Sequence, residues 1–127
     1  MGDPLFREHG RQVAALCWRP GPQILLITSL TTKRWIIPKG NLIRGLAPHE
    51  VAAREALEEA GLVGHVGKRC IGTFKFDRSR NGRDATCRVD VYALRVERQL
   101  PTWTEMDERL VLRCNVNTAL SLVSVPN

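Results

Sequence analysis

The 127-residue chain is basic, since 19 Lys and Arg residues against 13 Asp and Glu give a formal net charge of +6. A chain of this length suits a single domain and can bury roughly two-thirds of its unfolded surface. No apolar stretch approaches the ~18 residues of a membrane span, and the charged start of the chain is unlike a signal peptide, so we expect a cytoplasmic protein without a membrane partner. The basic residues form no single run and aromatic residues make up only 6% of the chain, which favours a small polyanion over nucleic acid as the partner.

The predicted elements begin with a β-hairpin. Residues 12–18 and 23–28 are apolar runs, and the R-P-G-P sequence between them is strong turn chemistry. A short strand near residues 34–37 follows. Beyond it, Gly40 allows backbone angles or close approaches that a Cβ would forbid.

A helix is predicted over residues 48–60. Pro48 fits the first helical position, and Glu50 falls in the first turn, where a negative charge is favourable. Gly61 fits the left-handed position just after the helix. The sequence therefore predicts both ends of this helix.

Three carboxylates share one side of the helix. At about 100° per residue, Glu55, Glu58 and Glu59 fall within an arc of roughly 100°, beside an arc of Ala and Leu residues. The i,i+4 pair of Glu55 and Glu59 costs a helix about 0.2–0.5 kcal/mol, and the macrodipole disfavours anions in this half of the helix. A divalent cation offsets both effects, because clustered carboxylates are ligands for a hard ion such as Mg²⁺. The pattern favours a metal site, and a solvated acidic face is the alternative.

The rest of the chain completes a sheet with a last helix. Residues 66–77 and 85–96 have the pattern of two longer strands, and Asn81-Gly82 between them favours a turn that pairs them antiparallel. Residues 109–114 are a further strand, and Asn115 or Asn117 caps a helix through about residue 123. This order of elements suits an α/β sandwich.

The four cysteines, at positions 17, 70, 87 and 114, show no C-x-x-C spacing and lie in or beside apolar runs. We expect reduced, mostly buried thiols, and neither a zinc site nor a disulfide framework. The three histidines are scattered, and a structural role is expected for each.

The stretch from residue 40 to residue 62 resembles the Nudix box, G-x5-E-x7-R-E-U-x-E-E-x-G-U, where U is a bulky aliphatic residue. Seven positions are in register, namely Gly40, Arg54, Glu55, Glu58, Glu59, Gly61 and Leu62. Two positions depart from the pattern. Leu46 stands where the family has its first Glu, and Ala56 replaces a larger aliphatic residue.

The resemblance implies the α/β (α+β) class and the Nudix fold, an α/β/α sandwich around a mixed sheet, in a single domain over residues 1–127. It also implies a Mg²⁺-dependent pyrophosphohydrolase, with Mn²⁺ as an alternative metal. The implied metal ligands are Glu55, Glu59, Glu58 and the Gly40 carbonyl. Glu58 is the implied general base, with Glu55 or Glu105 as alternatives. Arg54 is expected to orient Glu55 by a charge-assisted hydrogen bond, or else to form a surface ion pair.

Residues 34–40 and 103–106 resemble the branch of the family that contains diphosphoinositol polyphosphate and diadenosine polyphosphate hydrolases. This implies a substrate with several phosphates, either nucleoside diphosphate-linked, a dinucleoside polyphosphate or a diphosphoinositol polyphosphate. Lys39, Arg34, Arg78 and Arg80 are the candidate phosphate ligands, with simple solvent exposure as the alternative. Leu46 keeps open a Nudix domain that binds a nucleotide or polyphosphate without cleaving it. A nucleic-acid-binding module is a third hypothesis, and the oligomeric state is left open.

Overall fold

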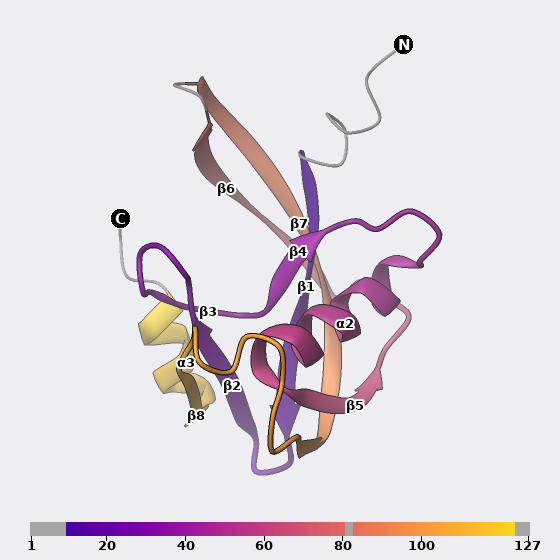
Figure 1. The fold of residues 1–127 in the computed structure, drawn as a ribbon, viewed down its shortest axis with the longest axis vertical. Helices are drawn as coiled ribbons and strands as arrows, with labels where there is room; N and C mark the ends of the chain where they lie inside the picture. Colours follow the sequence, from indigo (N-terminus) through magenta and orange to yellow (C-terminus); the bar gives the residue numbers. More distant parts are fainter. Residues whose placement is uncertain (1–9, 81–82, 124–127) are drawn as a thin grey trace.

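The computed structural model describes residues 10–80 and 83–123, and their side chains except those of residues 78–85. Helix α2 (Pro48–Ala60) packs on one face of a mixed β-sheet and helix α3 (Val116–Val123) on the other (Figure 1). The strands are β1 (Arg11–Arg19), β2 (Gln23–Thr28), β3 (Trp35–Ile36), β4 (Lys39–Asn41), β5 (Leu62–Val66), β6 (Gly72–Arg80), β7 (Arg83–Gln99) and β8 (Val111–Asn115). The predicted α/β/α sandwich is confirmed.

The sheet is built around the parallel pair β1 and β7. The strand order is β3-β2-β1-β7-β5, while β4 pairs with β1, β6 with β7 and β8 with β2. All of these other pairings are antiparallel. Because β4 joins β1 near its start, the chain that enters α2 leaves the sheet beside the centre of the fold.

Strand β1 is buried on both faces. Val13, Ala15 and Cys17 contact the cluster that contains α2, whereas Ala14 and Leu16 lie on the opposite face. A strand covered on both sides has a nearly continuous apolar sequence, as this one does. Helix α2 therefore packs on a strand in the buried interior of the sheet.

The prediction of one strand over residues 66–77 is wrong. These residues belong to two strands, β5 and β6, with a break between Val66 and Gly72. Strand β7 has 17 residues and is long enough to pair with both, with β6 along its first half and β5 along its second. A run of alternating residues does not show where its partner changes. The Asn81-Gly82 turn lies outside the described residues, but the antiparallel pairing of β6 and β7 is confirmed.

The two helices have the predicted ends. Helix α2 spans the predicted residues, and α3 is preceded by Asn115, whose Oδ1 accepts the N–H of Thr118 at 2.8 Å. All four cysteines are free, and Cys17 and Cys87 are buried as expected. Cys70 is exposed, because it lies in the segment between β5 and β6 at the border of the sheet.

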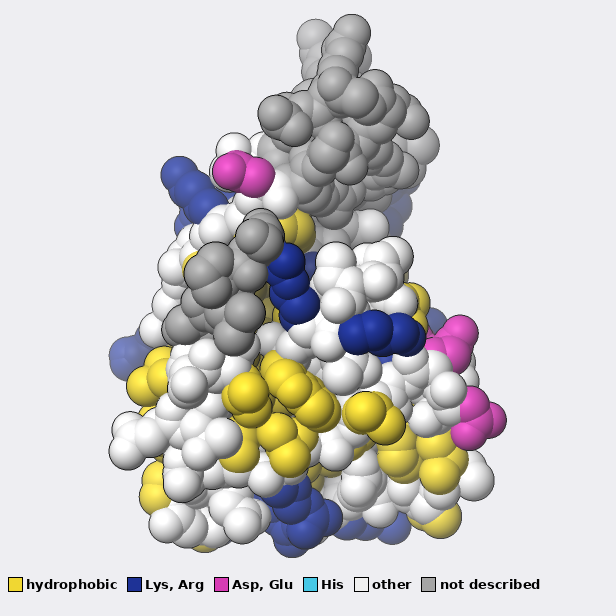
Figure 2. All heavy atoms as spheres, turned by 90° about the vertical axis from the view of Figure 1, so that its left-hand side faces the viewer, with side chains coloured by type: hydrophobic (Ala, Val, Ile, Leu, Met, Phe, Trp, Pro, Cys, Tyr) yellow, Lys and Arg dark blue, Asp and Glu magenta, His cyan; other side chains and the backbone are white. Residues whose placement is uncertain are grey.

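The outer side of α3 is apolar. Val116, Leu120 and Val123 recur at helical spacing and are exposed. Figure 2 shows hydrophobic side chains gathered on this face of the molecule, with Lys and Arg side chains above and below them. Ala119, on the inner side of the same helix, packs against Leu26 of β2.

Candidate active site

Helix α2 is fixed at both ends and along one side. The Ala47 N–H donates to Glu50 Oε1 at 2.8 Å at its start. Gly61, with a φ of 68°, ends the helix and donates its N–H to the Leu57 carbonyl at 3.0 Å. Val51 is fully buried between the helix and the sheet. These contacts set the direction in which the carboxylates of the helix point.

Glu55 lies against the backbone of Gly40. A Cβ built on Gly40 would overlap the Glu55 carboxylate, so any other residue would displace this side chain or β4. Gly40 pairs with Val13 in the ladder between β4 and β1, which ties this backbone to the sheet. Gly40 is not among the glycines with a positive φ, so close approach explains the glycine here.

Glu59 is 5% exposed and has a partner on each oxygen. Its Oε1 accepts the N–H of Lys39 at 3.3 Å, and its Oε2 lies 3.9 Å from Nη2 of Arg109. Burial raises the pKa of Glu59 to about 8, while the charge of Arg109 opposes this rise and the charge of Glu55 adds to it. Glu59 is therefore a buried acid with less positive charge around it than an ionised carboxylate requires.

Burial also raises the pKa of Glu55 to about 7, and the charges of Glu58 and Glu105 add to the rise. Two adjacent carboxylates with raised pKa values mark a place where added positive charge is favourable. A divalent cation fits the chemistry of these two acids. The backbone of Gly40 contacts Glu55 and therefore borders this candidate cation site.

Glu105 and Arg109 come from the loop between β7 and β8. The Glu105 N–H donates to the Glu58 carbonyl at 3.0 Å, which docks the loop on α2. The Arg109 Nε donates to Glu105 Oε1 at 2.8 Å, and its Nη1 donates to the Thr28 carbonyl at 3.0 Å. Glu105 was predicted from the sequence as an alternative base, whereas Arg109 was not predicted to belong to the site. No local signal links Arg109 to Glu59, because the i,i+4 spacing of Glu105 and Arg109 is informative only within a helix and these residues lie in a loop.

Glu58 and Arg54 lie on the exposed side of α2. The Arg54 Nε donates to Glu58 Oε1 at 3.0 Å, and the two side chains are 54% and 36% exposed. Of the two alternatives expected for Arg54, orienting Glu55 or forming a surface ion pair, the structure shows the surface ion pair. In this structure its hydrogen bond goes to Glu58, one helical turn further on, and Arg54 acts on Glu55 only through its charge.

Within the described residues, no three His, Cys, Asp or Glu side chains stand together as a metal cage. Glu55 and Glu59 fit a divalent cation, whereas Glu58 is turned toward Arg54. Leu46, at the position of the first box Glu, packs against the main hydrophobic core and supplies no carboxylate.

The candidate phosphate ligands lie in different places. The Lys39 backbone touches Glu59, but its Nζ donates to Gln12 Oε1 at 3.2 Å and lies 4.5 Å from the centre of the Phe76 ring. Arg34 precedes Trp35, which pairs with Thr28, the residue whose carbonyl Arg109 binds. The side chains of Arg78 and Arg80 lie outside the described residues.

A row of cations that was not predicted from the sequence crosses three strands. Arg11 pairs with Arg88 and Arg88 with Lys75, so their side chains share one face of the sheet. Arg11 shares this face with Val13, the partner of Gly40. The row therefore lies on the same side of the sheet as α2.

Asp90 orders two of these cations. It is 6% exposed and accepts hydrogen bonds from Arg11 at 3.1 Å, from Arg88 at 3.1 Å and from Thr73 at 3.0 Å. Burial alone would raise the pKa of Asp90, but these hydrogen bonds lower it below its ordinary value. One buried anion thus holds two guanidinium groups, and the row keeps a net positive charge.

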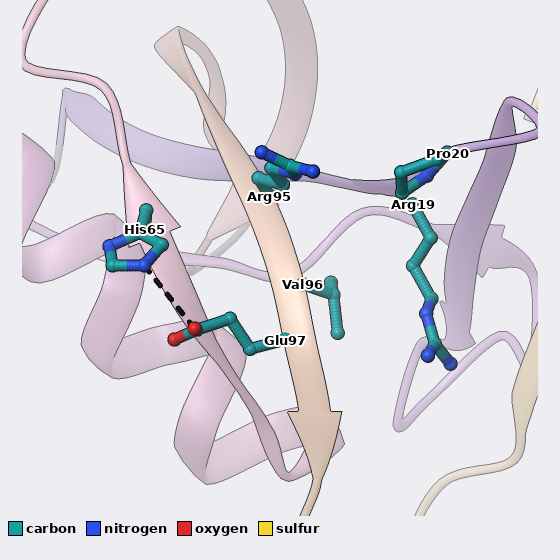
Figure 3. A pocket seen from close by; sticks show the side chains of 6 residues that line it. All are labelled: Arg19, Pro20, His65, Arg95, Val96 and Glu97. Carbon is teal, nitrogen blue, oxygen red and sulfur yellow. Dashed lines mark ion pairs between the residues drawn. The ribbon is translucent and has the colours of Figure 1, made fainter.

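The hollow in Figure 3 lies away from the acids. It has a volume of about 370 Å³ and is lined by Arg19, Pro20, His65, Arg95, Val96 and Glu97. Figure 3 shows the two arginine side chains pointing in different directions, while His65 Nε2 pairs with Glu97 at 3.3 Å. A second hollow of about 520 Å³ lies along α2, where Arg54 and Glu58 line it. Of the three helix acids, Glu58 lines the second hollow, and none lines the first.

The fold and the site together define a class of protein. In it, a helix on one face of an α/β/α sandwich carries two acids, Glu55 and Glu59, that lie against the backbone of the strand before the helix. A NUDIX domain family model matches residues 8–115. The chain belongs to the Nudix hydrolase family, as the box residues predicted.

Curated relatives agree with this family. Nudix hydrolase 13, mitochondrial, from Arabidopsis thaliana is 32% identical over 106 residues, which cover 79% of this chain and 52% of that protein. Diphosphoinositol polyphosphate phosphohydrolase 3-beta from Homo sapiens is 34% identical over 98 residues, which cover 75% of this chain and 56% of that protein. The chain spans about half the length of the curated relatives it matches.

Solved structures share the fold. A NUDIX hydrolase from Nitrosomonas europaea has a TM-score of 0.69 at 19% identity, covering 91% of this chain and 78% of that one. A binary complex of a C. elegans Ap4A hydrolase has a TM-score of 0.64 at 18% identity, covering 91% of this chain and 86% of that one. These similarities confirm the fold class.

Proposed function

We propose that this domain is a Mg²⁺-dependent pyrophosphohydrolase that cleaves a phosphoanhydride bond in a small molecule with several phosphates. The observation that carries the proposal is the pair of acids Glu55, which is half-buried, and Glu59, which is buried, packed against the backbone of β4 at Gly40 and Lys39. The buried Glu59 carboxylate is poorly compensated by the protein alone, since Arg109 is the one basic side chain that the structure places against it among the residues it describes.

In this proposal Glu55 and Glu59 hold the cation, and Gly40 (through its carbonyl) and Glu58 are further ligands. The cation neutralises charge on phosphate oxygens and lowers the pKa of water, with Mn²⁺ as an alternative to Mg²⁺. Glu58 is the proposed general base. Its hydrogen bond with Arg54 is exposed, so exchanging it for a contact with water or substrate costs little. Glu55 and Glu105 remain the alternatives for this role.

A substrate rich in phosphate suits the surface beside the acids. The row of Arg11, Arg88 and Lys75 lies on the α2 side of the sheet, and guanidinium groups bind phosphate oxygens bidentately. Lys39 and Arg34 are proposed as further phosphate ligands, with Arg78 and Arg80. Two of the proteins that this chain resembles are named for a diphosphoinositol polyphosphate and for Ap4A, which are both polyphosphates.

The test is a hydrolysis assay on a panel of diphosphate compounds with Mg²⁺ or Mn²⁺, with product masses to locate the broken bond. The panel contains nucleoside diphosphate derivatives, dinucleoside polyphosphates and diphosphoinositol polyphosphates. Glu59→Gln is the inactive comparison, and Glu97→Gln is the matched control because Glu97 pairs with His65 away from the acids. No product from any compound with either metal would rule out the enzyme.

Leu46 favours one alternative, a Nudix domain that binds a nucleotide or polyphosphate without cleaving it. Leu46 packs against the core at the position where the box has its first Glu, so the site lacks the carboxylate that this position would supply. Calorimetry that shows tight binding of a compound left intact after long incubation with metal would favour this alternative. Leu46→Glu should then bind Mn²⁺ more tightly than Leu46→Ala, since both lose the packing and only one adds a carboxylate.

The remaining expectations concern the whole protein. No helix in the part of the chain that the structure describes is long and apolar enough to cross a membrane. Cytoplasmic localisation stays a prediction, and two of the plant relatives are named as mitochondrial. A single domain and a small-molecule partner in place of nucleic acid are likewise proposals.

A further inference from the structure

Arg109 connects three parts of the fold with one side chain. Its Nε donates to Glu105 Oε1 at 2.8 Å in the loop, its Nη1 donates to the Thr28 carbonyl at 3.0 Å at the end of β2, and its Nη2 lies 3.9 Å from Glu59 Oε2 on α2. The side chain is 9% exposed, so these partners, and not water, surround the guanidinium. A guanidinium can serve all three because its five N–H donors form a fixed planar fork.

The backbone next to Arg109 is anchored independently of α2. The Leu110 N–H donates to Thr28 Oγ1 at 3.0 Å, and the Thr28 N–H donates to the Leu110 carbonyl at 3.2 Å. Thr28 is itself 5% exposed at the end of β2. The position of the guanidinium is therefore set by the sheet, and Glu59 meets a fixed partner.

The other oxygen of the Glu59 carboxylate has a partner of its own. Its Oε1 accepts the N–H of Lys39 in β4, while its Oε2 faces Arg109. The carboxylate is thus oriented by β4 and by Arg109, and not by the helix alone. Glu105, from a different element, is held by the same guanidinium.

We propose that Arg109 is a positioning residue of this site, which fixes the carboxylates of Glu59 and Glu105 relative to each other and does not contact the substrate. Its effect on turnover rests on the proposed hydrolase function. Its effect on the contact between Glu59 and Lys39 does not, because that contact joins two groups of the chain itself.

The test compares Arg109→Lys and Arg109→Met with Arg113→Lys and Arg113→Met, since Arg113 is an exposed arginine four residues further on in β8. Arg109→Lys keeps the charge and removes the fork, so it separates position from charge. Three quantities are measured on the full chain, namely amide hydrogen exchange of Lys39 and Glu105 in the metal-free protein, Mn²⁺ affinity by calorimetry, and kcat and KM.

In Arg109→Lys we expect exchange of the Lys39 N–H to rise at least about tenfold, since a misplaced carboxylate no longer holds it. The Mn²⁺ dissociation constant should rise at least about threefold. We expect kcat to fall at least about tenfold while KM stays within about twofold, because only positioning is lost. Arg109→Met should lose more on every measure, and the Arg113 variants should match the wild type.

Unchanged exchange at Lys39 together with unchanged Mn²⁺ affinity in Arg109→Lys would overturn the inference. A raised KM with unchanged kcat would also overturn it, because that pattern belongs to a direct substrate contact. If the Arg109 variants unfold, Glu105→Gln replaces them, since it weakens the bond to the Arg109 Nε and should produce the same changes in smaller measure. If the wild type hydrolyses nothing, the proposed function fails, and exchange at Lys39 still decides the positioning role.

Discussion

The Glu55 carboxylate occupies the space beside Gly40 that a side chain at position 40 would need. This relationship ties an acid of the helix α2 to the backbone of β4, which is itself paired with β1. The direction of Glu55 is therefore a property of the sheet as well as of the helix.

Replacing Gly40 by alanine should damage the site more than the fold. The added methyl group must displace Glu55, and overpacking of this kind typically costs about 1–3 kcal/mol of stability. We expect kcat to fall at least about tenfold because a misplaced ligand is costly. Urea unfolding and steady-state kinetics measure the two effects. Gly72→Ala is the control, since a Cβ there meets nothing within 4 Å, and equal behaviour of the two variants would contradict the role of Gly40.

Glu58→Gln and Glu59→Gln should each lower turnover at least about 100-fold, as expected for loss of a base or a metal ligand. Glu59→Gln should also weaken Mn²⁺ binding, whereas Glu58→Gln should do so less because Glu58 is turned toward Arg54. Circular dichroism checks that the fold is intact. Wild-type rates in either variant would refute its assigned role.

The metal-free protein should become less stable as pH rises from about 5 to about 8. The pKa values of Glu55 and Glu59 are raised to about 7 and about 8 in the folded state, from 4.5. In this window the folded state binds more protons than the unfolded state, so the free energy of unfolding decreases with rising pH. Melting temperatures in the presence of a chelator test this. The slope should be shallower in Glu59→Gln, and a melting temperature that rises with pH would contradict it.

The row of cations should act on substrate binding and not on chemistry. Arg88→Met removes one guanidinium and should raise KM about tenfold or more for a substrate with many phosphates, with a smaller change for a simple diphosphate. The value of kcat should stay within about twofold. Kinetics at two salt concentrations add a check, since screening weakens an exposed contact. Arg98→Met, an exposed arginine near the other end of β7, is the control.

The helix and its acids could be predicted because their signals are local. Pro48 and Gly61 mark the ends within the segment itself, and the fixed spacing of Glu55 and Glu59 shows that they share one side. Arg109 could not be predicted in this way, because Thr28 is 81 residues away in the chain. A single arginine in a polar loop has no periodic pattern that would link it to an acid of the helix.

The cationic row was missed for a related reason. Arg11 and Arg88 become neighbours only through the parallel pairing of β1 and β7, and neither carries a local mark of this contact. The error in residues 66–77 also arose from β7, whose length lets two strands follow one another along it. Local sequence signals therefore predicted the helix and its acids. The basic residues around the acids are brought there by long-range strand pairing, which local signals do not show.

The parallel pairing of β1 with β7 also bears on how the chain reaches its native state. Arg11 pairs with Arg88, and this pairing closes a long loop of the chain. The strands β4 and β5, which also contact α2, lie within that loop. Closing the loop costs conformational entropy before the contacts between β1 and β7 can stabilise the fold. Topologies with such long-range pairings fold more slowly than those with local contacts. Until residue 88 has been synthesised, β1 lacks its parallel partner β7, and the sheet face on which α2 packs is incomplete. A helix of 13 residues is only marginally stable without such packing.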